Sequence, residues 1–117
     1  MGGAIARGLI VAGLGSRLIL IDPAVKPADA RAFRAAGAKL DHDPAVIANE
    51  NPEAVILAVK PQLMPHVAPT YAIAARKALV ISIAAGTSIE SLNLWLDTPR
   101  ALVRAMPNLP ASIGKGI

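Results

Sequence analysis

The sequence predicts an α/β fold built on a doubly wound parallel sheet. Short apolar runs alternate along the chain with stretches of helical periodicity, which is the pattern of strand–helix–strand units joined by right-handed crossovers. Apolar residues make up 54% of the chain but aromatic residues only 3%, so the apolar content comes from Ala, Ile, Leu and Val. This composition is typical of strands that are buried on both faces, and it also indicates apolar surface that packs against a further segment or partner.

Apolar periodicity and turn residues predict the individual elements. Helices are expected over residues 1–12, 27–36, 44–49, 63–77 and 88–96. Strands are expected over residues 17–21, 38–40, 54–59, 79–83 and 101–104. The residues expected to end or begin the early elements are Gly13, Asp22-Pro23, Gly37 and Asp43-Pro44.

Single residues predict the buried face, the disturbed start or the cap of three of these helices. The first helix should turn Ile5, Leu9 and Ala12 to one face. Three prolines at positions 61, 65 and 69 disturb the start of the helix expected over 63–77, because proline lacks the amide N–H that a helix interior needs. Ser88 is a candidate N-cap for the last helix, with Ser91 as a second candidate.

Length, charge and composition limit the functional classes. A chain of 117 residues is the size of one modest domain. Its net charge is +4, but Lys and Arg are scattered without interleaved aromatic residues, which argues against nucleic-acid binding and favours small phosphorylated ligands. The chain has no Cys, no apolar run near the ~18 residues of a membrane span, and no signal-peptide pattern at its start, so we expect a cytoplasmic protein without disulfides or membrane partners.

Ligands of such sheets bind at the carboxyl ends of the strands, so the residues that follow each strand are informative. Two strand ends read Ala58-Val-Lys-Pro-Gln62 and Ser82-Ile-Ala-Ala-Gly-Thr-Ser88. The third segment, residues 100–117, runs from a strand into a Met-Pro-Asn-x-Pro turn and then an expected extended, Gly-punctuated stretch. Together the three segments resemble the nucleotide-binding half of pyrroline-5-carboxylate reductase, and the combination is far more specific than a lone Gly motif.

The resemblance implies a Rossmann-like NAD(P)-binding domain over residues 1–117. It implies hydride transfer from NADPH or NADH to the imine carbon of 1-pyrroline-5-carboxylate, a small-molecule substrate, giving L-proline. It also implies a homo-oligomer formed through a C-terminal dimerisation domain. That domain is not expected within these 117 residues.

The start of the chain looks like the end of a dinucleotide fingerprint. Met1-Gly2-Gly3-Ala4-Ile5 is similar to the tail of a Gly-x-Gly-x-Met-Gly motif, so we expect that the first strand and the Gly-x-Gly turn are missing. In the usual strand order 3-2-1-4-5-6 that strand is central, and its loss would leave two half-sheets. On this interpretation the chain alone binds dinucleotide poorly and has no turnover.

Candidate cofactor-binding residues lie at these turns. Asp22 follows a strand 20 residues after Gly2, where a carboxylate accepts hydrogen bonds from the ribose hydroxyls and repels the 2′-phosphate of NADP, although an ordinary turn role is equally expected and Lys26 would offset the charge. Lys60 should be extended because Pro61 follows it, and it is expected beside the cofactor pyrophosphate or nicotinamide, with a solvated lysine as the alternative. The full set of candidates is Met1, Gly2, Asp22, Ala58, Val59, Lys60, Pro61, Ala84, Ala85 and Asn108.

Each of the other candidates has a simpler alternative role. Ala84 and Ala85 would serve equally in tight packing, and Asn108 equally in a structural turn. His42 and His66 are isolated in sequence, which favours surface or helix-packing roles. We expect no catalytic residue in this half and no metal site.

Two other functional classes fit the same sequence. One is a different NAD(P)-dependent dehydrogenase, such as a hydroxyacid dehydrogenase. The other is a non-catalytic nucleotide-binding remnant.

Overall fold

The computed structural model describes residues 1–116 and has the predicted α/β character. Its α-helices are α1 (Gly2–Val11), α2 (Pro27–Ala35), α3 (Ile47–Glu50), α4 (Met64–Val67), α5 (Ala72–Ala75) and α6 (Ile89–Trp95). Its strands are β1 (Ile19–Ile21), β2 (Lys39–Asp41), β3 (Ala54–Leu57), β4 (Leu79–Ser82) and β5 (Ala101–Arg104). Short 3₁₀ helices connect them: η1 (Gly15–Arg17), η2 (Pro44–Val46), η3 (Pro61–Leu63), η4 (Ala68–Tyr71) and η5 (Leu109–Ile113).

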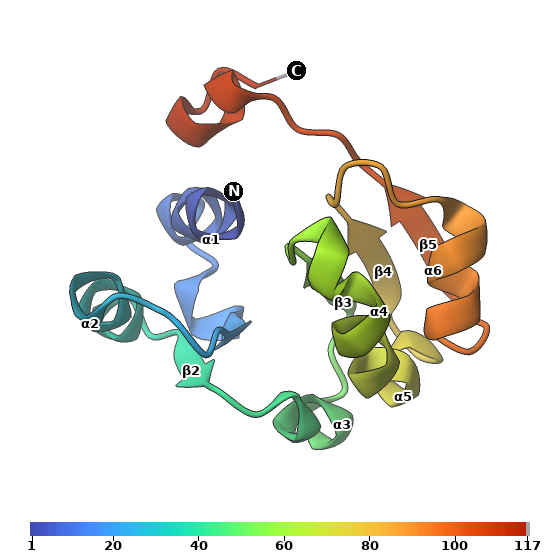
Figure 1. The fold of residues 1–117 in the computed structure, drawn as a ribbon. Helices are drawn as coiled ribbons and strands as arrows, with labels where there is room; N and C mark the ends of the chain where they lie inside the picture. Colours follow the sequence, from blue (N-terminus) through green and yellow to red (C-terminus); the bar gives the residue numbers. More distant parts are fainter. Residues whose placement is uncertain (117) are drawn as a thin grey trace. The chain divides into compact units, whose positions relative to one another are not determined.

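The strands form two separate sheets, and both are parallel (Figure 1). β1 pairs with β2, and β3, β4 and β5 pair in that order. The expected division into two half-sheets is therefore confirmed. The chain divides into two compact units: the first unit holds residues 1–43 and 108–116, and the second unit holds residues 44–107.

The first unit is held by a small apolar cluster between its helices and its two-stranded sheet. Ala6 of α1, Phe33 of α2 and Ala38 are buried, and Ile10, Leu18, Leu20, Val25 and Leu40 pack around them. The buried position of α1 is Ala6, while Ala12 is exposed, so the helix face expected from Ile5, Leu9 and Ala12 is rotated from the observed one.

Gly15 marks a close approach within the first unit. It is buried, and a Cβ atom built on it would lie 2.2 Å from the backbone oxygen of Ala36 at the end of α2. No real Cβ comes so near a carbonyl oxygen, so only glycine lets the turn after α1 pass the end of α2.

The second unit packs α4, α5 and α6 along its three-stranded sheet, with α6 beside β5 (Figure 1). Val55, Leu57, Val80 and Ser82 are the strand residues buried there. The fully buried helix residues are Met64, Ala68, Ala75 and Leu92, and Leu96 at the C-cap of α6 is also fully buried.

The alternate strand positions of this sheet are exposed. Ile56 is 39% exposed, Leu79 is 37% exposed and Val103 is 47% exposed. Ile56, Ile81 and Val103 are register partners in one row across the sheet. The expectation of strands buried on both faces is thus wrong for β3 and β4, whereas the expectation of leftover apolar surface is confirmed.

Two predicted segments differ from the structure because of proline. Residues 61–75 do not form one helix, since Pro61, Pro65 and Pro69 each lie in the first turn of a new short piece, the only place where a missing amide N–H is tolerated. Residues 109–113 form η5 and not an extended stretch, with Pro110 in its first turn and Gly114 left-handed at its end, φ 72°.

Other boundaries move by one to three residues. Arg17 belongs to η1 and not to a strand, and β3 ends at Leu57, two residues before the expected end. The cap of α6 is confirmed, because the Ser88 hydroxyl accepts the Ser91 backbone N–H at 3.1 Å.

Candidate functional site

The strand ends of the first unit bring Asp22 and His42 together. Register pairs Ile21 with Asp41, so the next residues of both strands emerge side by side, and the Asp22 backbone N–H donates to the Asp41 carbonyl at 3.1 Å. The His42 Nδ1 atom lies 3.0 Å from the Asp22 carbonyl oxygen. A carbonyl only accepts hydrogen bonds, so Nδ1 carries the proton and Nε2 is the ring atom left for another partner.

Hydrogen bonds to the local backbone hold the two carboxylates here. Asp22 Oδ1 accepts the Ala24 backbone N–H at 2.8 Å, and Asp41 Oδ1 accepts the backbone N–H groups of His42 at 2.7 Å and Asp43 at 3.0 Å. The Asp43 and then the His42 N–H groups hold the pKa of the exposed Asp41 carboxyl below its usual value, since they bond its charged form. In the part of the chain that the structure describes, Oδ1 is the Asp22 oxygen that accepts such a bond. Its Oδ2 atom can therefore accept a hydrogen bond from a sugar hydroxyl.

The strand ends of the second unit are small and apolar. The Ile83 backbone N–H donates to the Leu57 carbonyl at 3.2 Å, and the Ala105 N–H donates to the Ser82 carbonyl at 2.9 Å. These bonds place the ends of β3, β4 and β5 at one edge of the sheet. Ser82 is buried, and its hydroxyl accepts the Ala84 N–H at 3.4 Å.

Predicted site residues at this edge divide into packed and open positions. Ala58, Lys60, Pro61 and Ala85 are exposed and Val59 is half-buried. Ala84 is only 5% exposed, so its methyl group serves the interior. Lys60 is extended, φ −60° and ψ 139°, as Pro61 predicts. Small open positions such as these let a flat ring system approach the backbone.

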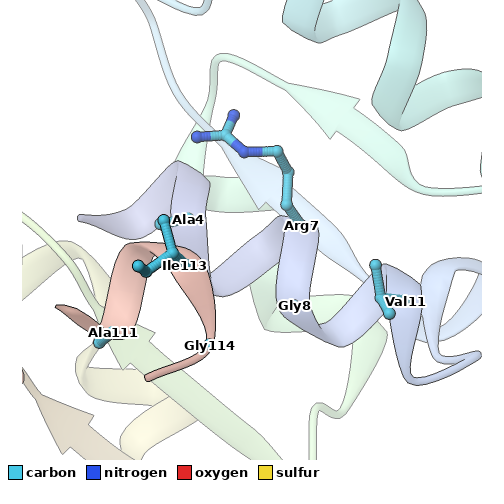
Figure 2. A pocket seen from close by; sticks show the side chains of 7 residues that line it. All are labelled: Ala4, Arg7, Gly8, Val11, Ala111, Ile113 and Gly114. Carbon is cyan, nitrogen blue, oxygen red and sulfur yellow. The ribbon is translucent and has the colours of Figure 1, made fainter. Parts of the chain in front are cut away.

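Asn108 belongs to the first unit, at the start of η5. Its carbonyl accepts the Ala111 N–H at 3.0 Å, but its side chain does not cap η5. η5 and α1 flank an open pocket of about 460 Å³ (Figure 2). Its lining residues are Ala4, Arg7, Gly8, Val11, Ala111, Ile113 and Gly114.

This pocket is not the predicted cofactor site. None of the candidate residues lines it. Its one charged side chain, Arg7, pairs with Asp29 of α2 at 3.4 Å. With both groups roughly half exposed, that pair adds little stability.

Candidate residues are thus divided between the two units. Met1, Gly2, Asp22 and Asn108 lie in the first unit, and the six others lie in the second unit. His42 and Ser82 are polar strand-end residues that the sequence did not identify as part of the site. The signal for His42 was its place one residue after a strand; no signal pointed to the buried hydroxyl of Ser82.

Within residues 1–116, no three His, Cys, Asp or Glu side chains are grouped to hold a metal ion. The helices over the same residues are too short or too polar to cross a membrane.

Comparison with known sequences finds relatives named pyrroline-5-carboxylate reductase. A protein named pyrroline-5-carboxylate reductase from Haemophilus influenzae is 48% identical over 66 residues. The alignment covers 56% of this chain and 24% of the Haemophilus influenzae protein. The same enzyme from Vibrio alginolyticus is 38% identical over 118 aligned positions, covering 97% of this chain and 42% of its own. This chain therefore spans less than half the length of these relatives.

Solved structures show the same fold. A pyrroline-5-carboxylate reductase from Coxiella burnetii superposes with a TM-score of 0.81 at 28% identity, over 97% of this chain and 42% of its own. The pyrroline carboxylate reductase of Plasmodium falciparum, solved with NADP bound, superposes with a TM-score of 0.77 at 24% identity, over 99% of this chain and 42% of its own. The predicted Rossmann-like fold and the predicted resemblance are confirmed.

Family assignment rests on most of the chain. The family model described as NADP oxidoreductase, coenzyme F420-dependent, matches residues 1–86, which include α1, both strand ends of the first unit and the ends of β3 and β4. The chain belongs to this NADP oxidoreductase family.

Proposed function

We propose that this chain is the NAD(P)H-binding part of a pyrroline-5-carboxylate reductase, which reduces 1-pyrroline-5-carboxylate to L-proline. The observation that carries the proposal is the similarity to the Vibrio alginolyticus reductase, which extends over 97% of the chain. The strand ends supply the second support, because they combine a carboxylate in one sheet with small open residues in the other.

Each set of strand ends has its own candidate role in binding the cofactor. Asp22 presents a carboxylate that can accept hydrogen bonds from the ribose of the adenosine half. Met1 and Gly2 begin α1, whose N-terminus favours a pyrophosphate. Ala58, Val59, Lys60, Pro61, Ala85 and Asn108 would lie along the nicotinamide half, with Ala84 fixing the backbone from the interior.

The bound nicotinamide supplies the hydride for the imine carbon. The protein groups of this part orient the ring and keep water away, and we assign no catalytic residue to them. A protonated imine is already electrophilic, so a strong general acid is not required here.

The remaining features of the enzyme belong to the same proposal. The alignment covers 42% of the Vibrio alginolyticus reductase. We infer that the remaining part of such an enzyme completes the substrate pocket and forms the homo-oligomer. On this basis the 117 residues form one NAD(P)-binding domain without turnover of its own. A cytoplasmic location fits a biosynthetic reductase.

A chimera tests the proposal directly. The matched segment of the Vibrio alginolyticus reductase is replaced by this chain, and NADPH-dependent reduction of 1-pyrroline-5-carboxylate is measured beside hydroxyacid oxidation and coenzyme F420 reduction. We expect imine reduction alone, with the unmodified reductase as the control. A chimera that binds NADPH but acts on a hydroxyacid or on coenzyme F420 would overturn the proposed substrate.

Binding by the chain itself separates a cofactor domain from a remnant. NADPH is titrated into the 117-residue chain, and energy transfer from its single tryptophan to the nicotinamide is followed. Saturable binding, even if weak, is expected. Complete absence of binding, or proline-dependent reduction of the cofactor by the chain alone, would contradict the proposed division of roles.

A further inference from the structure

We propose that His42 is a specificity-determining residue that lets this site accept the 2′-phosphate of NADPH beside Asp22. The inference rests on the proposed nucleotide-binding function and deepens it. Its basis is the hydrogen-bonded placement of the ring at the carboxyl ends of β1 and β2.

The position of the ring is the first step. Its Nδ1 atom donates to the Asp22 carbonyl at 3.0 Å, so the imidazole is anchored on the same residue whose carboxylate is the candidate ribose ligand. His42 is exposed, so its ring is open to solvent. A ligand group that approaches Asp22 therefore meets a histidine as well as a carboxylate.

The charge of the ring is the second step. A carboxylate alone favours the ribose diol of NADH and repels a 2′-phosphate. A histidine ring ordinarily gains a proton near pH 6.5. With Nδ1 already donating, a second proton sits on Nε2, and the ring becomes a cationic donor suited to a phosphate oxygen.

The neighbouring charged residues determine how strongly a charge on the ring attracts a phosphate. The acidic residues at these two strand ends are Asp22 after β1, and Asp41 and Asp43 at the end of β2. The charged residues of α2 and its N-cap, next to β2, are Lys26, Asp29, Arg31 and Arg34. Lysines, arginines and most carboxylates keep one charge from about pH 5.5 to 8, whereas an imidazole and an α-amino group ordinarily change charge in that range.

The test compares two adenine nucleotides. Dissociation constants of adenosine 2′,5′-bisphosphate and adenosine 5′-monophosphate are measured by calorimetry at about pH 5.5 and about pH 8, either side of the ordinary imidazole transition. In the wild-type chain we expect the preference for the bisphosphate to be about three- to tenfold stronger at the lower pH, the range of a solvent-exposed charge-assisted hydrogen bond. The phosphate itself ionises near pH 6, so a small pH effect remains without the histidine.

Two substitutions separate charge from structure. His42→Gln keeps a polar side chain and should leave only the small effect of the phosphate. His42→Lys keeps a positive charge throughout and should hold the bisphosphate preference high at both pH values. His66→Gln, which removes the other histidine from an exposed position of α4, is the matched control and should behave as wild type.

The outcomes are distinct. If His42→Gln retains the full pH dependence, or if His42→Lys lowers the bisphosphate preference, the assignment of His42 is wrong. If no variant binds either nucleotide saturably, the nucleotide-binding function fails and this inference fails with it. Circular dichroism of each variant establishes that the comparison is between folded proteins.

Discussion

The residues at the strand ends differ in chemistry between the two units, although the sheets of both units are parallel. In the first unit, β1 and β2 end in Asp22, Asp41 and His42, whose side chains and backbone are tied by hydrogen bonds of 2.7 to 3.1 Å. In the second unit, β3 and β4 end in Ala58, Val59, Ala84 and Ala85, which offer backbone and methyl groups. One set therefore presents charged and polar groups, and the other presents small apolar groups.

On the proposed function, this difference would suit two different tasks in cofactor binding. A ribose or phosphate is distinguished by charge and hydrogen bonds, so polar side chains are useful at one end. A flat nicotinamide ring needs close approach to the backbone, which the small exposed side chains of Ala58 and Ala85 would permit at the other. Substitutions that affect one unit alone can therefore show how independent these tasks are.

The largest effect is expected from Gly15→Ala in the first unit. The added methyl group would lie 2.2 Å from the Ala36 carbonyl oxygen, so the backbone must shift at a cost of about 2–3 kcal/mol in the free energy of unfolding. Urea denaturation measures the loss. Hydrogen exchange should show weaker protection of β1 and β2 amides and unchanged protection of β4.

Gly8→Ala is the matched control for Gly15→Ala. Gly8 lies inside α1 with nothing within 4 Å of an added Cβ, so alanine should stabilise the helix by about 0.5–1 kcal/mol. Equal effects of the two substitutions would contradict the close approach at Gly15.

Asp22→Ser should change cofactor choice. Loss of a charge-assisted partner for the ribose hydroxyls costs about 1–3 kcal/mol, or roughly ten- to a hundredfold in NADH affinity, while NADPH loses a repulsive neighbour. The ratio of the two dissociation constants is the measurement, and Glu90→Gln in α6 is the control for charge alone. An unchanged ratio would mean that Asp22 serves only its turn, through the bond to Ala24.

Ser88→Ala should weaken the second unit by a smaller amount. The substitution removes the hydroxyl that accepts the Ser91 N–H at 3.1 Å, and a lost N-cap costs about 1 kcal/mol. Thermal denaturation measures it. Asn93→Ala, at an exposed position of α6, should have little effect or stabilise slightly. If both variants lose the same stability, the cap does not hold the helix.

The smallest effect concerns Tyr71 in the second unit. Burial raises the pKa of its phenol above 10.0, because the charged form is poorly solvated. The folded state favours the neutral ring, so this contribution to stability is fully present below about pH 10 and is lost as the pH rises through the folded pKa.

The single tyrosine makes that measurement simple. Tyrosinate absorbance in the folded chain should rise at higher pH than in urea, and Tyr71→Phe should remove this part of the alkaline destabilisation. Equal titration curves in the folded and denatured chain would show that Tyr71 is solvated.

Local signals explain what the sequence predicted correctly. Pro27 in the first turn of α2 and the N-cap Ser88 before α6 are start signals whose action depends on neighbours a few residues away. The end of β5 at Arg104 and the extended backbone of Lys60 are equally local. Such features are visible in the sequence because they are decided within one turn of chain.

The missed features depend on distant contacts or on competing local rules. The hydrogen bond from His42 to Asp22 spans 20 residues and follows from strand register, which the sequence does not state. Gly15 has no left-handed backbone to mark it, and its constraint comes from Ala36. Between residues 61 and 75, apolar periodicity favoured one helix while the prolines divided it, and the steric rule prevailed.

The exposed row of the three-stranded sheet affects how the protein is handled. Ile56 and Val103 lie in one row with Ile81 between them, so solvent meets a stripe of branched side chains along a sheet. Sulfate and other strongly hydrated salts increase the tendency of such surface to leave water. We expect turbidity to rise with ammonium sulfate, and buffers of low ionic strength with glycerol to keep concentrated samples clear.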